Sequence, residues 1–193
     1  MRYKVLDQFG IQFLTFTVVD WCDVFTRKAY KEIIIESLRY CQEHKGLVSY
    51  AYVIMTNHLH LVVRAQGEVP ISNIIRDFKR FTGTQLINAV QENQQESRRD
   101  WLLHRFAWNA KRVSGNRQFQ FWKADNHPFL LYSPQMIWQK INYIHYNPVV
   151  AGIVKRPEDY IYSSASNYEG QGGVLEVTLM EPYNPIGYVH LER

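Results

Sequence analysis

The sequence predicts an α+β fold: a ferredoxin-like βαββαβ sandwich with an antiparallel sheet, followed by a C-terminal helix that carries a tyrosine. Three observations support this prediction. Some segments alternate β-branched and aromatic residues with other residues, as strands do. The segments between them repeat apolar residues at three- and four-residue steps, as helices do. The order along the chain is strand, helix, strand, strand, helix, strand, helix, and its first six elements make the split βαβ pattern.

The first third of the chain contains three expected strands and one helix. We expect Ile11–Asp20 to form a strand, because it is rich in aromatic and β-branched residues whose side chains would point alternately to the two faces of a sheet. Lys28–His44 is a helix because its apolar residues recur at helical steps, and Gly46 stops it. Leu47–Met55 and His58–Ala65 are rich in strand-forming residues and are separated by a Thr-Asn turn, so we expect a hairpin.

The rest of the chain adds two helices and one strand. Ile71–Gln91 has a continuous apolar helical face. Gln91–Ser114 is polar at first and then mixes arginines with aromatic residues, so it is either a flexible insertion or a surface for single-stranded nucleic acid. We expect a strand within Phe119–Leu131. Ser133 caps a helix that begins with a proline and runs over residues 134–146.

Length and composition indicate one domain with an extension. The chain has 193 residues, of which 46% are hydrophobic, enough to build a core. We expect a domain over residues 1–168 and a tail over residues 169–193. The net charge of +4 permits a polyanionic partner without requiring one. There is no CxxC pair, signal peptide or membrane-spanning run in the sequence, so we expect a reduced, cytoplasmic protein.

The tripeptide His58-Leu59-His60 opens the second strand of the expected hairpin. Side chains at positions i and i+2 of a strand share a face, so both imidazoles project together while Leu59 enters the core. Two adjacent imidazoles make half of a divalent-metal site. The tripeptide alone is also compatible with two polar residues on a solvated face.

A tyrosine on the last expected helix completes a possible catalytic set. Tyr143 lies off the buried stripe, and Asn147 follows it by one helical turn, so an amide oxygen could become the third ligand of a metal held by the histidines. Lys140, one turn earlier, could contact a phosphate or favour the phenolate. A tyrosine can attack a phosphodiester and hold the phosphate as an ester. Each residue also has a plain interpretation: a helix-surface tyrosine, a terminator before Pro148, and a solvated lysine.

Basic residues outside this set are candidates for contact with DNA phosphates. They lie on the outer side of the second helix and in the basic-aromatic segment that follows. These candidates are Arg76, Lys79, Arg80, Arg98, Arg99, Arg105, Lys111 and Arg112. A solvated helix face and a flexible insertion are the alternatives.

Two separated motifs, MTNHLHLVV at residues 55–63 and KINYIHYNPVVAGIVKRPEDYIYSS at residues 140–164, resemble the REP-associated single-tyrosine transposases of the HUH class. The resemblance covers roughly residues 5–168. It implies a ferredoxin-like nuclease that uses Mg²⁺ or Mn²⁺ and binds structured single-stranded DNA. Such enzymes cut next to a hairpin through a 5′-phosphotyrosine intermediate. The family register favours Tyr143 over Tyr146 as nucleophile.

Other functions remain compatible with the same residues. A non-catalytic or domesticated DNA-hairpin-binding protein would keep the fold, but it would not need His58, His60, Tyr143 and Asn147 together. A replication initiator or relaxase shares the chemistry, although the chain carries no helicase or long C-terminal domain. A phosphodiesterase that uses metal-bound water would not need the tyrosine. The sequence leaves open whether the protein is a monomer or a homodimer.

Overall fold

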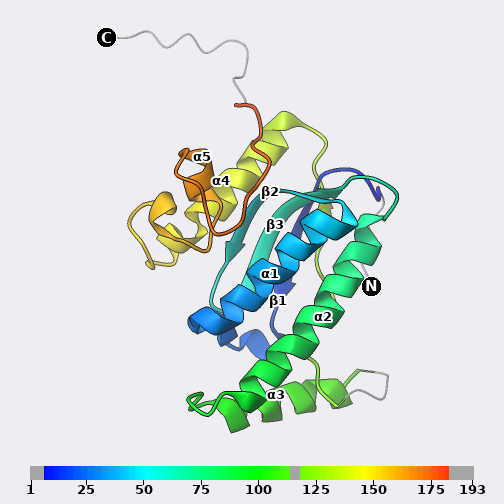
Figure 1. The fold of residues 1–193 in the computed structure, drawn as a ribbon, viewed down its shortest axis with the longest axis vertical. Helices are drawn as coiled ribbons and strands as arrows, with labels where there is room; N and C mark the ends of the chain where they lie inside the picture. Colours follow the sequence, from blue (N-terminus) through cyan, green and yellow to red (C-terminus); the bar gives the residue numbers. More distant parts are fainter. Residues whose placement is uncertain (1–6, 114–117, 183–193) are drawn as a thin grey trace.

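A computed structural model describes residues 7–113 and 118–182. Figure 1 shows a curved sheet, a pair of long helices across its front, and a further helix that crosses the molecule near the C-terminal end. The elements in chain order are β1 (Gln12–Thr17), η1 (Val19–Trp21), η2 (Val24–Thr26), α1 (Lys28–Lys45), β2 (Leu47–Ile54), β3 (His58–Ala65), α2 (Ile71–Glu92), α3 (Arg99–Lys111), β4 (Phe129–Leu130), α4 (Pro134–Val150), η3 (Pro157–Asp159) and α5 (Ala165–Tyr168).

The sheet has the strand order β2-β3-β1-β4, and every neighbouring pair is antiparallel. This is the arrangement in which two split βαβ units interleave, so the predicted ferredoxin-like architecture is confirmed. The register of β1 against β3 places Thr15 opposite His60 and Thr17 opposite His58. Both histidines are therefore paired with residues of β1, in the middle of the sheet.

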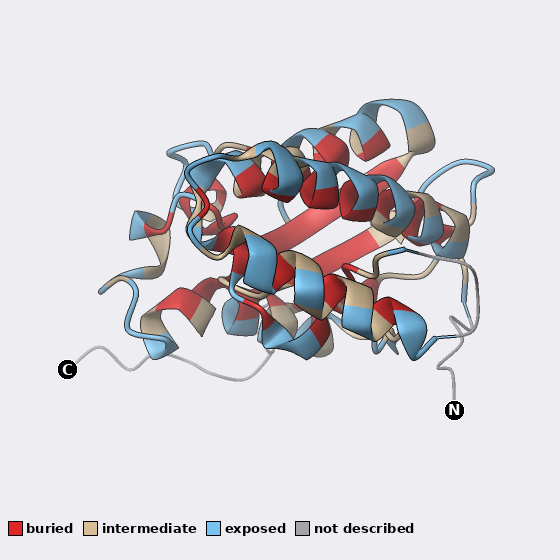
Figure 2. Ribbon diagram, turned by 90° about the horizontal axis from the view of Figure 1, so that it is seen from below, coloured by how far each residue is buried: buried red, intermediate tan, exposed pale blue. Residues whose placement is uncertain are grey.

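Helices cover both faces of the sheet. Successive residues of β1 point to opposite faces, and the ring of Phe16 lies 5.6 Å from that of Phe78 on α2. The ring of Phe13, on the other face, lies 6.0 Å from that of Tyr143 on α4. Helices α1 and α2 thus cover one face and α4 covers the face that carries the histidines. The buried sides of the helices turn toward the strands, whose residues are almost all buried (Figure 2).

Two elements in the C-terminal half of the chain differ from the sequence-based expectation in length. The strand expected within residues 119–131 is reduced to the two residues of β4 and an isolated bridge from Trp122 to Val18. The intervening chain still bonds to β1, but His127 adopts a positive φ of 44° that breaks the extended run. Helix α4 continues through Pro148 to Val150, because a proline near the end of a helix removes only one hydrogen bond.

The segment Gln91–Ser114, for which a flexible insertion was one of two interpretations, contains α3. This helix buries only Leu102, Phe106 and Ala110 against the rest of the protein, which is a narrow apolar stripe in an otherwise polar sequence. Its weak periodicity explains why the sequence pattern did not predict it. None of the helices in the described part of the chain is long and apolar enough to cross a bilayer.

The open edge of β2 is covered by the chain that follows α4. The backbone N–H of Ile54 donates to the carbonyl of Tyr162 (2.9 Å), and that of Ser164 donates to the carbonyl of Tyr52 (3.0 Å). An exposed strand edge would otherwise present unpaired backbone groups to other chains. Residues 174–181 then pass over α1 and α4, with the buried Leu175 as their apolar anchor.

Replacing Glu96 with glutamine will destabilise this fold. The fully buried carboxylate accepts hydrogen bonds from Arg27 (2.7 Å) and Arg98 (3.1 Å). The substitution leaves the two guanidinium charges without their carboxylate partner. We expect the free energy of unfolding to fall by about 2–3 kcal/mol, less than for a fully buried pair, because solvent still reaches the arginines. Urea unfolding measures this, with Glu92→Gln at an exposed position of α2 as the control.

The Glu96 contribution should depend on pH in one direction. Burial raises the pKa of this carboxyl, but the hydrogen bonds from Arg98 and Arg27 outweigh it and lower the pKa overall. A group whose pKa is lower in the folded state stabilises the fold above its unfolded pKa, about 4.3. This stabilisation is lost as the pH falls through the folded-state pKa. A Glu96→Gln deficit that stays the same at neutral and strongly acid pH would contradict the account.

Candidate active site

The two histidines lie side by side on β3. Leu59 between them is fully buried, and the rings of His58 and His60 are 4.7 Å apart. The strand alternation predicted from the sequence therefore brings both imidazoles to one face. That face is the one covered by α4.

Each imidazole is oriented by a hydrogen bond at its Nδ1 atom. Nδ1 of His58 lies 2.8 Å from the amide oxygen of Asn57, and Nδ1 of His60 lies 2.8 Å from the hydroxyl of Thr15. The Asn57 Nδ2 donates to the carbonyl of Trp21, which fixes the direction of that amide. Because the Asn57 oxygen can only accept, Nδ1 of His58 carries the proton and its Nε2 keeps a lone pair. Orientation through Nδ1 is the usual arrangement of histidines that ligate metals through Nε2.

The environment keeps both imidazoles neutral. Burial, followed by the charges of His58 and Lys140, lowers the pKa of His60 to about 3. Burial also lowers the pKa of His58 below its usual value. A neutral imidazole is the form that donates a lone pair to a metal. The pair therefore has the right protonation state for metal binding at neutral pH.

Tyr143 on α4 faces the histidine pair. Its hydroxyl lies 3.5 Å from Nε2 of His60, and the two rings make an edge contact with centroids 5.2 Å apart. The side chain remains 49% exposed, so a substrate can reach the hydroxyl. Tyr146 is equally exposed, yet it makes no hydrogen bond or ring contact with any other described residue. The structure brings Tyr143, and not Tyr146, to the histidines.

The other two residues predicted for the site lie on the same helix. The ammonium of Lys140 is 4.7 Å from the ring centre of Phe13 and 5.6 Å from that of Tyr143, so a cation sits next to the phenol. Asn147 is half-buried one turn beyond Tyr143, and its side chain hydrogen-bonds to no other residue in the described ranges. Its amide oxygen is therefore available as a ligand.

The donors present fit a divalent cation with open coordination positions. Among the described residues, no group of three or more His, Cys, Asp or Glu side chains could hold a metal ion. The donors that the structure brings together are the imidazoles of His58 and His60. Asn147 remains the predicted oxygen donor. Two imidazole nitrogens and one amide oxygen leave positions for phosphate oxygens and water, as a catalytic metal requires. Oxygen and imidazole donors together are compatible with Mn²⁺, and with Mg²⁺ where water completes the shell.

Several of the predicted DNA-binding arginines pair with residues of the protein itself. Arg98 bonds to Glu96, Arg99 to Asp100, and Arg105 to Asp20. Arg105, and Arg98 through a further hydrogen bond to the carbonyl of Asp23 (2.9 Å), join α3 and the loop before it to the segment after β1, whereas the Arg99–Asp100 pair lies within α3. Two further basic candidates lie exposed at the end of α3, namely Lys111 and Arg112.

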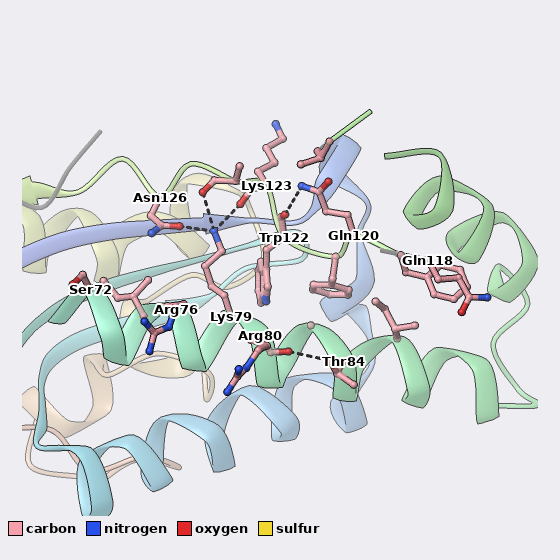
Figure 3. A pocket seen from close by; sticks show the side chains of 17 residues that line it. Ser72, Arg76, Lys79, Arg80, Thr84, Gln118, Gln120, Trp122, Lys123 and Asn126 are labelled. Atoms are coloured by element: carbon pink, nitrogen blue, oxygen red, sulfur yellow. Dashed lines mark hydrogen bonds between the residues drawn. The ribbon is translucent and has the colours of Figure 1, made fainter. Parts of the chain in front are cut away.

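The remaining predicted cations line a groove between α2 and residues 118–126, with a volume of about 870 Å³. Arg76 and Arg80 are mostly exposed along it, and both guanidinium groups lie near the carboxylate of Asp77, at 3.2 and 3.9 Å. The expectation that Lys79 lies on the outer side is wrong. Its ammonium turns inward and donates to the carbonyl of Lys123 (2.6 Å) and to Asn126 (Figure 3). The acceptors of its hydrogen bonds include backbone carbonyls, whose positions cannot be predicted from the sequence. Lys79 therefore joins α2 to residues 118–126.

Sequence reasoning missed the turn at Asp20-Trp21. The expected strand ran through Asp20, whereas β1 ends at Thr17 and η1 follows. The turn brings the ring of Trp21 to 6.0 Å from that of His58. No periodic signal marks such a position. The only hint is a tryptophan among polar residues directly after a strand.

Residues 14–116 match the family model described as "Transposase IS200 like", which is just over half of the chain. The chain belongs to this transposase family. The resemblance seen in the two sequence motifs is thereby confirmed at the level of the family, a family of DNA-binding proteins that carry out DNA transposition. No curated protein matches the chain.

Solved structures extend the likeness beyond the matched region. One is the structure of a REP-associated tyrosine transposase bound to a REP hairpin, with a TM-score of 0.62, 13% identity, and coverage of 95% of this chain and 94% of that one. Another is a putative transposase from Deinococcus radiodurans R1, with a TM-score of 0.42, 15% identity, and coverage of 75% and 95%. At 13% identity the first likeness shows a shared fold, which includes the part of the chain that carries α4.

Proposed function

We propose that this IS200-like family member cleaves and rejoins single-stranded DNA next to hairpins, through a 5′-phosphotyrosine on Tyr143 and with Mg²⁺ or Mn²⁺. The catalytic domain would span residues 1–168, with residues 169–193 as a tail, and the protein would act in the cytoplasm. The observation that carries the proposal is the 3.5 Å approach of the Tyr143 hydroxyl to Nε2 of His60. A nucleophile and two metal-ligating side chains of one chain meet there.

The cleavage step uses residues present in the site. The oxygen of Tyr143 attacks the phosphorus, the bond from phosphorus to the 3′ oxygen breaks, and its electron pair leaves with that oxygen. The 3′ oxygen takes up a proton, and the 5′ phosphate stays esterified to Tyr143. The Tyr143 phenol must lose its proton for this step. The proton of the Tyr143 phenol passes to solvent, which reaches this half-exposed side chain, while the lone pair of His60 Nε2 serves the cation and Lys140 stabilises negative charge at the phenol.

A divalent metal, when bound, would supply Lewis-acid polarisation of the scissile phosphate. In this chain His58, His60 and Asn147 would hold it. The phosphotyrosine conserves the energy of the broken bond. Attack by another 3′-hydroxyl on the same phosphorus therefore rejoins a strand without an external energy source.

The choice of a hairpin substrate draws on the REP-associated transposase of the same fold, which is bound to a REP hairpin. The net charge of +4 and the exposed guanidinium groups of Arg76 and Arg80 favour a polyanion. A non-catalytic hairpin-binding protein is the alternative that the following experiment separates.

Covalent capture tests the proposal. The protein is incubated with labelled single-stranded hairpins of randomised stems and flanks, with Mg²⁺, with Mn²⁺ or with a chelator, and resolved on denaturing gels. We expect a metal-dependent protein–DNA adduct, and sequencing of the trapped strand identifies the substrate. Hairpin binding in a parallel gel-shift assay, with no adduct in either metal, would instead support the binding-protein alternative.

The groove between α2 and residues 118–126 should contribute phosphate contacts. We expect Arg80→Ala to reduce the slope of log binding constant against log salt by about 0.7, the value per neutralised phosphate on a single strand. The measurement is fluorescence anisotropy with a labelled single strand at several salt concentrations. Lys28→Ala, an exposed lysine at the start of α1, is the control. An unchanged slope in the Arg76→Ala/Arg80→Ala double variant would contradict the contact.

A further inference from the structure

A sharp turn after β1 presents Trp21 to solvent beside the candidate active site. Asp20 and Trp21 have φ angles of 53° and 56°. Residues other than glycine seldom adopt positive φ, because the Cβ atom crowds the backbone, and two in succession persist only where the surroundings hold them. The Trp21 side chain is nevertheless 54% exposed. The fold thus maintains a strained turn whose result is an exposed indole ring.

Helix α3 holds this turn through Asp20. The carboxylate of Asp20 accepts hydrogen bonds from Arg105 (2.5 Å) and from Asn109 (2.8 Å), which lie one helical turn apart. The backbone N–H of Val19 donates to the carbonyl of Phe121 (2.9 Å). Arg105 is therefore a positioning residue for the turn, and its charge is used within the protein.

The turn is also joined to the histidine pair. The side chain of Asn57 donates to the carbonyl of Trp21 (3.3 Å), and its oxygen is the partner of Nδ1 of His58 (2.8 Å). The same Asn57 amide also donates to Asp23 (2.9 Å). One amide thus fixes both the tryptophan backbone and the orientation of a proposed metal ligand. The position of the indole relative to His58, whose ring lies 6.0 Å away, is set by the fold.

A cation completes the surface. The ammonium of Lys123 lies 4.4 Å from the centre of the Trp21 ring. Lys123 also lines the groove that carries Arg76 and Arg80. The surface therefore runs from the groove through Lys123 and Trp21 to His58. Cations that contact phosphates and an exposed aromatic ring that stacks on a base are the two components of a single-strand site.

We propose that Trp21 stacks on an unpaired base of the DNA strand next to the scissile phosphate, while Lys123 neutralises a phosphate of the same segment. The inference rests on the proposed function, because the strand it places is the one cut at Tyr143. Stacking does not depend on base identity, so the contact contributes affinity and position for any sequence.

Photocrosslinking tests the contact directly. Oligothymidylate with 5-iodouracil in place of thymine is irradiated with the wild-type protein, and the crosslinked peptides are mapped by mass spectrometry. Oligothymidylate is a sufficient probe because stacking tolerates every base. We expect a crosslink at Trp21. Crosslinks only at other residues, or none at all, would overturn the proposal.

Matched variants give the energetic test. We expect Trp21→Ala to weaken binding of labelled oligothymidylate roughly five- to a hundredfold, the range for loss of one stacked base, and Trp21→Phe to retain most of the affinity. Tyr40→Ala is the control, since Tyr40 is also 54% exposed but lies on α1, across the sheet from the histidines. Equal affinities of the Trp21→Ala and Tyr40→Ala variants would overturn the proposal.

The two proposals can fail separately. If the wild type forms no adduct while Trp21 crosslinks and its variant loses affinity, the proposed function fails and the stacking contact stands. If the wild type forms the adduct but Trp21→Ala binds normally, only the stacking proposal fails.

Discussion

The Tyr143→Phe variant will form no covalent adduct with DNA. The substitution removes one oxygen atom, which is the proposed nucleophile, and leaves the ring that packs at 6.0 Å from Phe13 and 5.2 Å from His60. Loss of a nucleophile lowers the rate roughly a thousandfold or more, so adduct formation should fall below detection on a denaturing gel. Binding of the same hairpin should stay within about twofold, because stacking and phosphate contacts remain.

Tyr146 supplies the matched control for this prediction. It lies three residues further along α4, is 55% exposed, and carries the same phenol without the contact to His60. Tyr146→Phe should form adduct at the wild-type rate. If Tyr143→Phe kept the adduct and Tyr146→Phe lost it, the assignment of the nucleophile would be wrong. If Tyr143→Phe still cleaved DNA without an adduct, water would be the nucleophile and the protein would be a phosphodiesterase.

The His60→Ala variant should be the second most severe. His60 faces both the phenol of Tyr143 and the proposed metal, so its loss removes a ligand and a neighbour of the nucleophile together. We expect adduct formation to fall roughly a hundredfold or more and chelation of divalent metal to abolish the remainder. Titration of Mn²⁺ against adduct yield, in the wild type and in the variant, measures both effects.

Two controls separate metal binding from folding in that experiment. His44→Ala removes an exposed histidine from α1 and should leave the metal titration unchanged. Thr15→Val removes the hydroxyl that orients His60 through its Nδ1 atom, and should weaken the apparent metal affinity by about ten- to a hundredfold. A His60→Ala variant with wild-type metal dependence would show that the histidine pair holds no metal.

Local periodicity was sufficient for much of the fold and for half of the candidate site. Alternation along β3 predicts that His58 and His60 share a face, and the rings are indeed 4.7 Å apart. Helical spacing placed Tyr143 off the buried stripe. Neither pattern says which face of the sheet α4 covers. That the tyrosine reaches His60 follows from the packing of the last helix, which the sequence indicated only through its resemblance to known transposases.

The features that sequence did not predict are set by tertiary contacts. Lys79 was expected among outward cations, yet carbonyls of the loop after α3 draw its ammonium inward. The pairing of Arg105 with Asp20 was likewise not predicted. The turn at Trp21 requires positive φ angles that no propensity favours at Asp and Trp, and α3 maintains it from far along the chain.

The central claim is that DNA becomes attached to Tyr143, and mass spectrometry of the trapped complex tests it most directly. The adduct is digested with nuclease and protease, and the peptides of α4 are searched for a retained nucleotide. The account predicts a 5′-phosphate ester on Tyr143, present with Mg²⁺ or Mn²⁺ and absent with chelator. A nucleotide on Tyr146 or on any other residue would contradict it.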